Sequence, residues 1–101
     1  MEYIYLVAIG IMVNIFGYFN FKGNINSIHW YNRARVTKEN EKKYGKMMGI
    51  GMMIMGTGII VTTLLQIIFD SESLWLITVI SIIVGLLFMI YGQFKYNKGI
   101  F

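Results

Sequence analysis

Three long uncharged stretches divide the chain. They cover residues 3–19, 47–69 and 74–91, and contain 17, 23 and 18 residues. A helix rises ~1.5 Å per residue, so the ~30 Å hydrocarbon core of a bilayer needs ~20 apolar residues, with a range of ~17–25. With the residues at their ends, the predicted spans are 3–21, 47–69 and 74–92. The stretches lack the alternation of barrel strands, and helices are the other form that satisfies backbone groups in lipid.

The connections between the predicted spans differ greatly in length. Residues 70–73 separate the second span from the third, and so short a link joins antiparallel neighbours, which predicts a tight hairpin. Residues 22–46 form a long loop between the first two spans, and residues 93–101 follow the third as a tail. We therefore expect an all-α membrane protein, with a single membrane domain of three transmembrane helices over residues 1–101.

All nine Lys and Arg residues lie on one predicted side of the membrane. Seven fall in residues 22–46, and the other two, Lys95 and Lys98, fall in the tail. The N-terminus holds only Glu2, and residues 70–73 hold two acidic residues and no basic one. Because cytoplasmic loops carry an excess of Lys and Arg, the basic loop and the tail are predicted to be cytoplasmic. The N-terminus is then outside and the C-terminus inside.

Composition supports a membrane protein and excludes several other classes. Hydrophobic residues make up 56% of the chain and charged residues 14%, whereas soluble domains carry ~25% charged residues. Too few polar residues remain to cover a soluble core, and the lack of Cys excludes a disulfide scaffold. The net charge of +4 is explained by membrane orientation. We therefore expect contact with a bilayer that has anionic headgroups, and no binding to nucleic acid.

The basic loop contains a predicted helix start and a predicted surface segment. Thr37 is a candidate N-cap, because Glu39 and Glu41 follow it and acidic residues are favourable in a first helical turn. The second helix is expected to begin near Lys38 and to run to Phe69. Aromatic and basic residues upstream are expected to lie in the headgroup zone. The candidates for contact with the membrane surface or with a partner are Trp30, Arg33, Arg35, Lys42 and Lys43.

Small residues recur at helical spacing in each predicted span. In lipid, helices associate through close packing of small residues and a few polar bonds rather than through hydrophobic burial. Asn14 is the most polar side chain at mid-depth; it is expected to bond to a hydroxyl of a neighbouring helix, with contact to a substrate or an ion as the alternative. The candidates for helix packing are Gly10, Asn14, Gly17, Gly49, Gly56, Ser81 and Gly85.

Few residues in the sequence could carry chemistry. No Asp, Glu, Lys, Arg or His lies inside a predicted span, whereas proton-coupled transport generally needs such a group. The single histidine, His29, has no metal partner nearby, and no paired carboxylates or Cys are available. We expect no enzyme activity, no metal and no cofactor. Met48, Met52 and Met55 share a helical face that could bind Cu(I), although methionine is also a flexible apolar filler.

The loop and the second span resemble a group of small bacterial integral membrane proteins. The resemblance rests on IHWYNR at residues 28–33 and TKENEKKYGK at residues 37–46, followed by a Gly- and Met-rich span. It implies a multi-pass protein of the bacterial plasma membrane from a family of unknown function, with one span, a cytoplasmic linker and a pair of spans. It implies no activity.

The leading functional hypothesis is a non-enzymatic protein of the bacterial plasma (inner) membrane that binds another membrane component. Examples are an immunity protein against a membrane-active toxin and a regulatory subunit. The partner is expected to be a second copy of the chain, forming a homo-oligomer, or another membrane protein. The alternative is a holin-like pore former, which has the same topology and size, and a small-solute or copper carrier is the third hypothesis.

Overall fold

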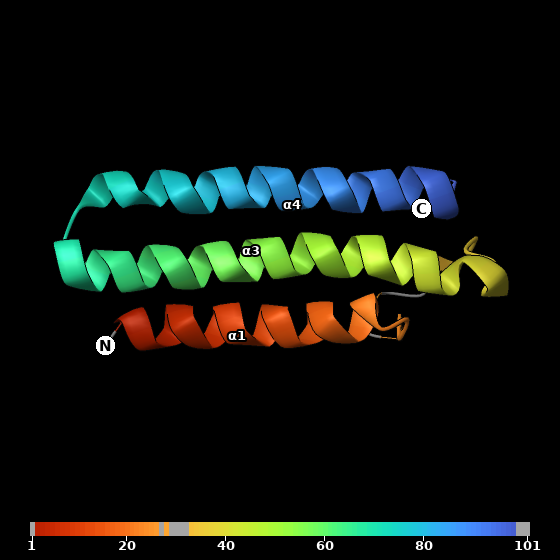
Figure 1. Ribbon diagram of the computed structural model, residues 1–101, viewed down its shortest axis with the longest axis horizontal. Helices are drawn as coiled ribbons and strands as arrows, with labels where there is room; N and C mark the ends of the chain where they lie inside the picture. Colours follow the sequence, from red (N-terminus) through yellow and green to blue (C-terminus); the bar gives the residue numbers. More distant parts are fainter. Residues whose placement is uncertain (1, 27, 29–32, 99–101) are drawn as a thin grey trace.

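Three long helices make up most of the structure. The computed structural model describes residues 2–26, 28 and 33–98. No strand occurs among these residues, which confirms the predicted all-helical class. The long helices are α1 (Glu2–Phe21), α3 (Glu41–Phe69) and α4 (Trp75–Tyr96) (Figure 1). Each is long and apolar enough to cross a membrane.

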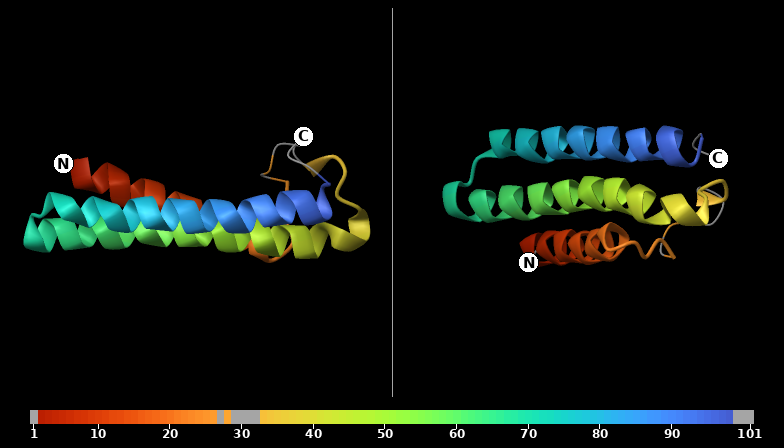
Figure 2. Two further views of the ribbon diagram at one scale, coloured as in Figure 1. Left: turned by 90° about the horizontal axis from the view of Figure 1, so that it is seen from above. Right: turned by 45° about the vertical axis from the view of Figure 1, so that its right-hand side comes forward.

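Helix α3 lies between α1 and α4 and packs against both of them (Figures 1 and 2). Both neighbours run antiparallel to α3, and the molecule is 46 Å long. The end of α1, the start of α3 and the end of α4 therefore lie together at one end of the molecule. All nine basic residues belong to this end, through residues 22–46, Lys95 and Lys98, and we call it the basic end.

The helix ends show why the chain reverses where it does. Gly23, at φ 104°, follows α1, and the Asn24 N–H donates to the Phe19 carbonyl oxygen at 3.0 Å. This is a Schellman-type ending, in which glycine adopts the left-handed conformation at no steric cost. Helix α3 ends in the simpler αL motif, in which Asp70 is left-handed at φ 49° and its N–H donates to the Gln66 carbonyl oxygen at 2.9 Å.

One helix boundary agrees with the sequence prediction and another differs. The predicted start near Lys38 is confirmed, because a short 3-10 helix, η1 (Lys38–Asn40), leads directly into α3 and the two form one continuous helical stretch over Lys38–Phe69. Thr37 has the extended backbone of an N-cap but makes no capping hydrogen bond with its side chain. Helix α4, which follows a second 3-10 helix, η2 (Glu72–Leu74), continues to Tyr96 and so includes residues expected in the tail.

Burial within the molecule is reversed relative to a soluble protein. Large apolar side chains point outward; for example, Ile4 is 67% exposed, Ile68 70% and Leu87 61%. The buried positions within the helices are mainly Gly and Thr. A bilayer is a suitable surrounding for such an apolar surface, since helices in lipid associate through small residues. The chain is therefore a small multi-pass membrane protein.

Candidate functional site

Several of the most buried polar side chains gather at the basic end. Tyr44, Asn20 and Asn97 are each 0% exposed, and Gln93 is 7% exposed. They come from the start of α3, the last two turns of α1 and α4, and the residue after α4. The Gln93 amide Nε2 donates to the Tyr44 hydroxyl at 2.7 Å. This hydrogen bond joins α3 to α4 just beyond the predicted spans 47–69 and 74–92.

Asn97 attaches the linker, the segment of the chain between α1 and η1, to the end of α4. Its side-chain oxygen Oδ1 accepts the backbone N–H of Arg35 at 2.8 Å, across 62 residues of sequence. Its own backbone N–H donates to the Gln93 carbonyl oxygen and closes the last turn of α4. Arg33 fixes the linker internally, because its Nε donates to the Ile28 carbonyl oxygen at 2.9 Å.

A small apolar core packs beside the residues that make these hydrogen bonds. Ile25 is 4% exposed, Met48 is 5% exposed, and both pack with Tyr44. Half-buried apolar side chains from the linker and from α4 surround them. The Asn20 amide donates to the Asn24 carbonyl oxygen at 2.9 Å and holds the chain where it leaves α1. We call this set of residues the buried cluster: Asn20, Ile25, Tyr44, Met48, Gln93 and Asn97.

Sequence reasoning missed the buried cluster. Gln93 was expected in the tail, and Tyr44 was considered only as part of a motif. A signal was present, because Gln93 and Asn97 are one helical turn apart and Tyr44 and Met48 are spaced in the same way. Residues at such spacing at the end of a span indicate one packed face. The pairing between distant segments could not be read from the spacing.

Exposed lysines surround an open pocket beside the buried cluster. The pocket lies where α1 ends beside the first turns of α3, and it has a volume of about 570 Å³. The Lys46 ammonium lies 5.7 Å from the centre of the Phe21 ring, within reach of a cation–π interaction. We call this open pocket the lysine pocket. Its lining residues are Phe21, Lys22, Glu39, Lys42, Lys43 and Lys46.

The predicted surface residues are distributed over this end. Lys42 and Lys43 are exposed and line the lysine pocket. Arg35 is exposed and Arg33 half-buried, and both belong to the linker attached to the buried cluster. Trp30 and His29 lie outside the described residues.

The packing candidates of α1 face α3. A methyl group added to Gly10 would lie 2.9 Å from the Gly56 carbonyl oxygen, and one added to Gly17 would lie 3.0 Å from the Gly49 carbonyl oxygen. Such distances leave no room for a side chain, so these four glycines let the two backbones touch. Asn14 lies between the two pairs.

Asn14 makes both a local and an interhelical hydrogen bond. Its Nδ2 donates to the Gly10 carbonyl oxygen at 3.0 Å, and its Oδ1 accepts the Thr57 hydroxyl of α3 at 3.3 Å. Both functional groups of the amide are therefore used inside the protein, and the side chain also lines an open, largely apolar pocket between α1 and α3.

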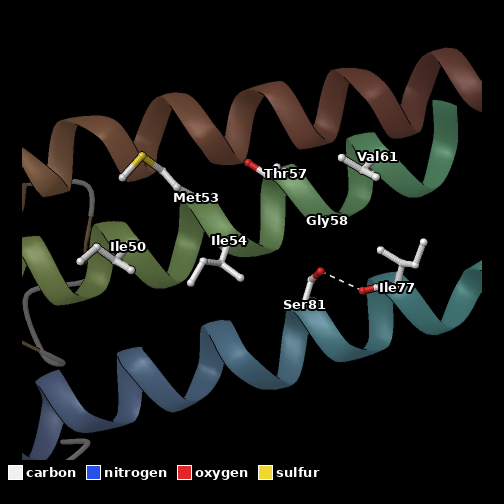
Figure 3. Close-up of a pocket in the computed structure, with 8 residues that line it drawn as sticks. All are labelled: Ile50, Met53, Ile54, Thr57, Gly58, Val61, Ile77 and Ser81. Carbon is white, nitrogen blue, oxygen red and sulfur yellow. Dashed lines mark hydrogen bonds between the residues drawn. The ribbon is translucent and has the colours of Figure 1, made fainter. Parts of the chain in front are cut away.

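The packing candidates of α4 face the opposite flank of α3. Methyl groups added to Gly51 and Gly85 would each lie 2.5 Å from the other's carbonyl oxygen. Ser81 occupies the space beside Gly58, and its hydroxyl donates to the Ile77 carbonyl oxygen at 2.8 Å (Figure 3). Farther from the basic end, the Thr78 hydroxyl donates to that of Thr62 at 2.8 Å.

Met48, Met52 and Met55 lie on a side of α3 that packs inside the molecule. Met52 contacts Gly17 of α1, Met55 contacts Gly85 of α4, and Met48 belongs to the buried cluster. Each side chain therefore fills space beside a glycine or in the small core, which is the packing role of methionine. Within the described part of the chain, no group of three or more His, Cys, Asp or Glu could hold a metal ion.

An open groove runs along α3 on the side that carries Ile50, Ile54 and Val61. It is lined by Ile50, Met53, Ile54 and Val61 of α3 and by Ile77 and Ser81 of α4 (Figure 3). Its lining is almost entirely apolar.

Comparison with known proteins places the chain in a family without assigning an activity. No curated protein and no solved structure matches it. One family model matches residues 4–97 and so covers all three helices, the linker and the buried cluster. The chain belongs to this family, which is described as a domain of unknown function, DUF3784.

Proposed function

We propose that the chain is a non-enzymatic protein of the bacterial plasma membrane that acts by binding another component of that membrane. The N-terminus lies outside and the basic end lies in the cytoplasm, because this places all nine Lys and Arg residues inside. A second membrane protein, such as a membrane-active toxin or a subunit that the chain regulates, is the expected class of partner.

The observation that carries the proposal is the buried cluster. Hydrophobic spans alone need no packed structure outside the bilayer. Here Asn97 attaches the linker to α4, and Gln93 joins α4 to Tyr44 of α3. These bonds hold the described segments of the basic end to one another, and a fixed surface binds a partner at a lower entropy cost than a mobile one.

The hydrogen bonds between the helices support binding rather than transport or catalysis. Asn14 bonds to Thr57, and Thr62 bonds to Thr78, so these polar groups link helices to one another. Interhelical bonds of this kind stabilise a bundle by ~0.6 kcal/mol on average. The fixed arrangement of the helices then supports the surface at the basic end.

Co-purification after cross-linking in intact cells tests the proposal. The tagged chain is expressed at its native level, cross-linked and isolated in mild detergent. Asn97→Ala removes the bond to the linker and is expected to lower the yield of the cross-linked partner severalfold. Thr63→Val is the matched control, because the Thr63 hydroxyl donates to the Ile59 carbonyl oxygen of its own helix, away from the basic end. The proposal fails if the wild-type chain is isolated alone or if Asn97→Ala retains the full yield.

A further inference from the structure

The lysine pocket and the groove lie on one continuous face of α3. Successive residues of a helix turn by ~100°, so residues spaced three, four or seven apart share a face. Lys43, Lys46, Ile50, Ile54 and Val61 follow this spacing. Helix α1 borders the face at the lysine pocket, and α4 borders it along the groove. Along this face of α3 the charged pocket is therefore followed by an apolar groove.

The dimensions of this face match one leaflet of a bilayer. Ile50 and Val61 are 11 residues apart, which corresponds to ~16 Å along a helix. Half of a hydrocarbon core is ~15 Å thick, and the headgroup layer adds ~5–7 Å. Lys46 precedes Ile50 by four residues, or ~6 Å. The lysine ammonium groups thus lie at headgroup depth when the groove lies at the depth of acyl chains.

The positive charge of the lysine pocket favours a negatively charged ligand. Four lysines line it against a single carboxylate, that of Glu39. Lysine ammonium groups bind phosphate as point charges. Because basic pockets between membrane helices on the cytoplasmic side bind anionic headgroups, the expected ligand carries a phosphate and an acyl chain on one molecule.

We propose that the lysine pocket and the groove together form a binding site for one anionic phospholipid of the cytoplasmic leaflet. The headgroup phosphate lies among Lys22, Lys42 and Lys46, and an acyl chain lies in the groove along Ile50 and Ile54. The site rests on the proposed function and deepens it, since it names a lipid as one component that the chain binds. A lipid held there would also cover the outward face of α3.

Native mass spectrometry of the full chain in mild detergent tests the site. The probes are phosphatidylglycerol and phosphatidylcholine with identical acyl chains, added at equal concentration. The wild-type chain is expected to retain phosphatidylglycerol preferentially. Lys42→Gln with Lys46→Gln is expected to weaken that retention roughly thirtyfold. Lys95→Gln with Lys98→Gln is the matched control, because it removes the same charge at the same end outside the pocket and is expected to keep the preference.

A second arm separates a lipid from a soluble phosphate. Inorganic phosphate and glycerol phosphate, added in large excess, are expected to leave the bound phosphatidylglycerol in place. Far-UV circular dichroism and gel filtration establish that each variant keeps the fold.

Each contrary result overturns the inference. The lipid site is wrong if the chain shows no preference for phosphatidylglycerol, if the pocket variant keeps the preference, or if the control variant loses it equally. It is also wrong if soluble phosphate displaces the lipid. If the lipid preference is absent while Asn97→Ala still reduces a cross-linked partner protein, the lipid site fails and the proposed function stands. If the wild-type chain carries neither lipid nor protein, both fail.

Discussion

Replacement of Gly51 by alanine tests whether α3 and α4 touch backbone to backbone. The added methyl group would lie 2.5 Å from the Gly85 carbonyl oxygen and 2.6 Å from Cγ of Met89. Ordinary van der Waals contact of a Cβ begins at 3.4 Å, so the helices must separate locally by about 0.9 Å. A side-chain shift can relieve the contact with Met89, but the carbonyl oxygen is part of the backbone.

The expected loss of stability follows from this displacement. A gap of ~0.5–1 Å forfeits a quarter to a half of the dispersion energy of the atoms that face it. Overpacking of this kind costs ~1–3 kcal/mol. The change from glycine to alanine also favours a helix by ~1 kcal/mol. Gly92→Ala is the matched control, since its methyl group meets the Met47 side chain at 3.0 Å and nothing else within 3.7 Å.

Titration from mild detergent into SDS measures the free energy of unfolding of these variants. Trp75 fluorescence reports on α4 once Trp30 is replaced by Phe. We expect Gly51→Ala to be ~1–3 kcal/mol less stable than Gly92→Ala. Combining Gly51→Ala with Gly85→Ala should cost less than the sum of the two, because one separation accommodates both methyl groups. The reasoning is refuted if Gly51→Ala is as stable as Gly92→Ala.

Two further predictions concern hydrogen bonds between α3 and α4, measured by the same titration. Tyr44→Phe removes the hydroxyl that accepts the Gln93 amide at 2.7 Å and should cost ~1–3 kcal/mol, because that amide is buried; an unchanged midpoint would argue against the buried cluster. Thr62→Val and Thr78→Val should each cost ~0.6 kcal/mol, with ~1.7 kcal/mol as the upper bound. The double variant should be less destabilised than the sum, and strict additivity would show that the two hydroxyls do not interact.

The long helices could be predicted from the sequence because their signal is local. An uncharged stretch of the right length specifies a helix in lipid whatever its neighbours are. The end of α3 at Phe69 was predicted on this basis and is confirmed. The end of α4 was placed four residues too early, because Gln93 and Lys95 reduce the apolar signal although Gln93 packs against Tyr44. Tertiary contacts, rather than the apolar character of these residues, explain why the helix continues to Tyr96.

The candidate site could be predicted only in part, because it depends on which segments meet. The exposed lysines follow from the excess of basic residues in the loop, and Lys42 and Lys43 were expected at a surface. The bond between Arg35 and Asn97 joins residues 62 positions apart and leaves no local pattern. At Thr37 the local pattern predicts more than the structure contains. The acidic residues that follow Thr37 predict a side-chain cap, and the Thr37 side chain makes no capping hydrogen bond.

Cysteine labelling in intact cells is the most direct test of the central claim, that the chain crosses the membrane three times with its basic end in the cytoplasm. The chain contains no cysteine, so single substitutions report without background. We predict that Ser73→Cys reacts with an impermeant maleimide from outside, whereas Thr37→Cys reacts only after the membrane is permeabilised. The reverse pattern, or recovery of the chain in the soluble fraction, would contradict the account.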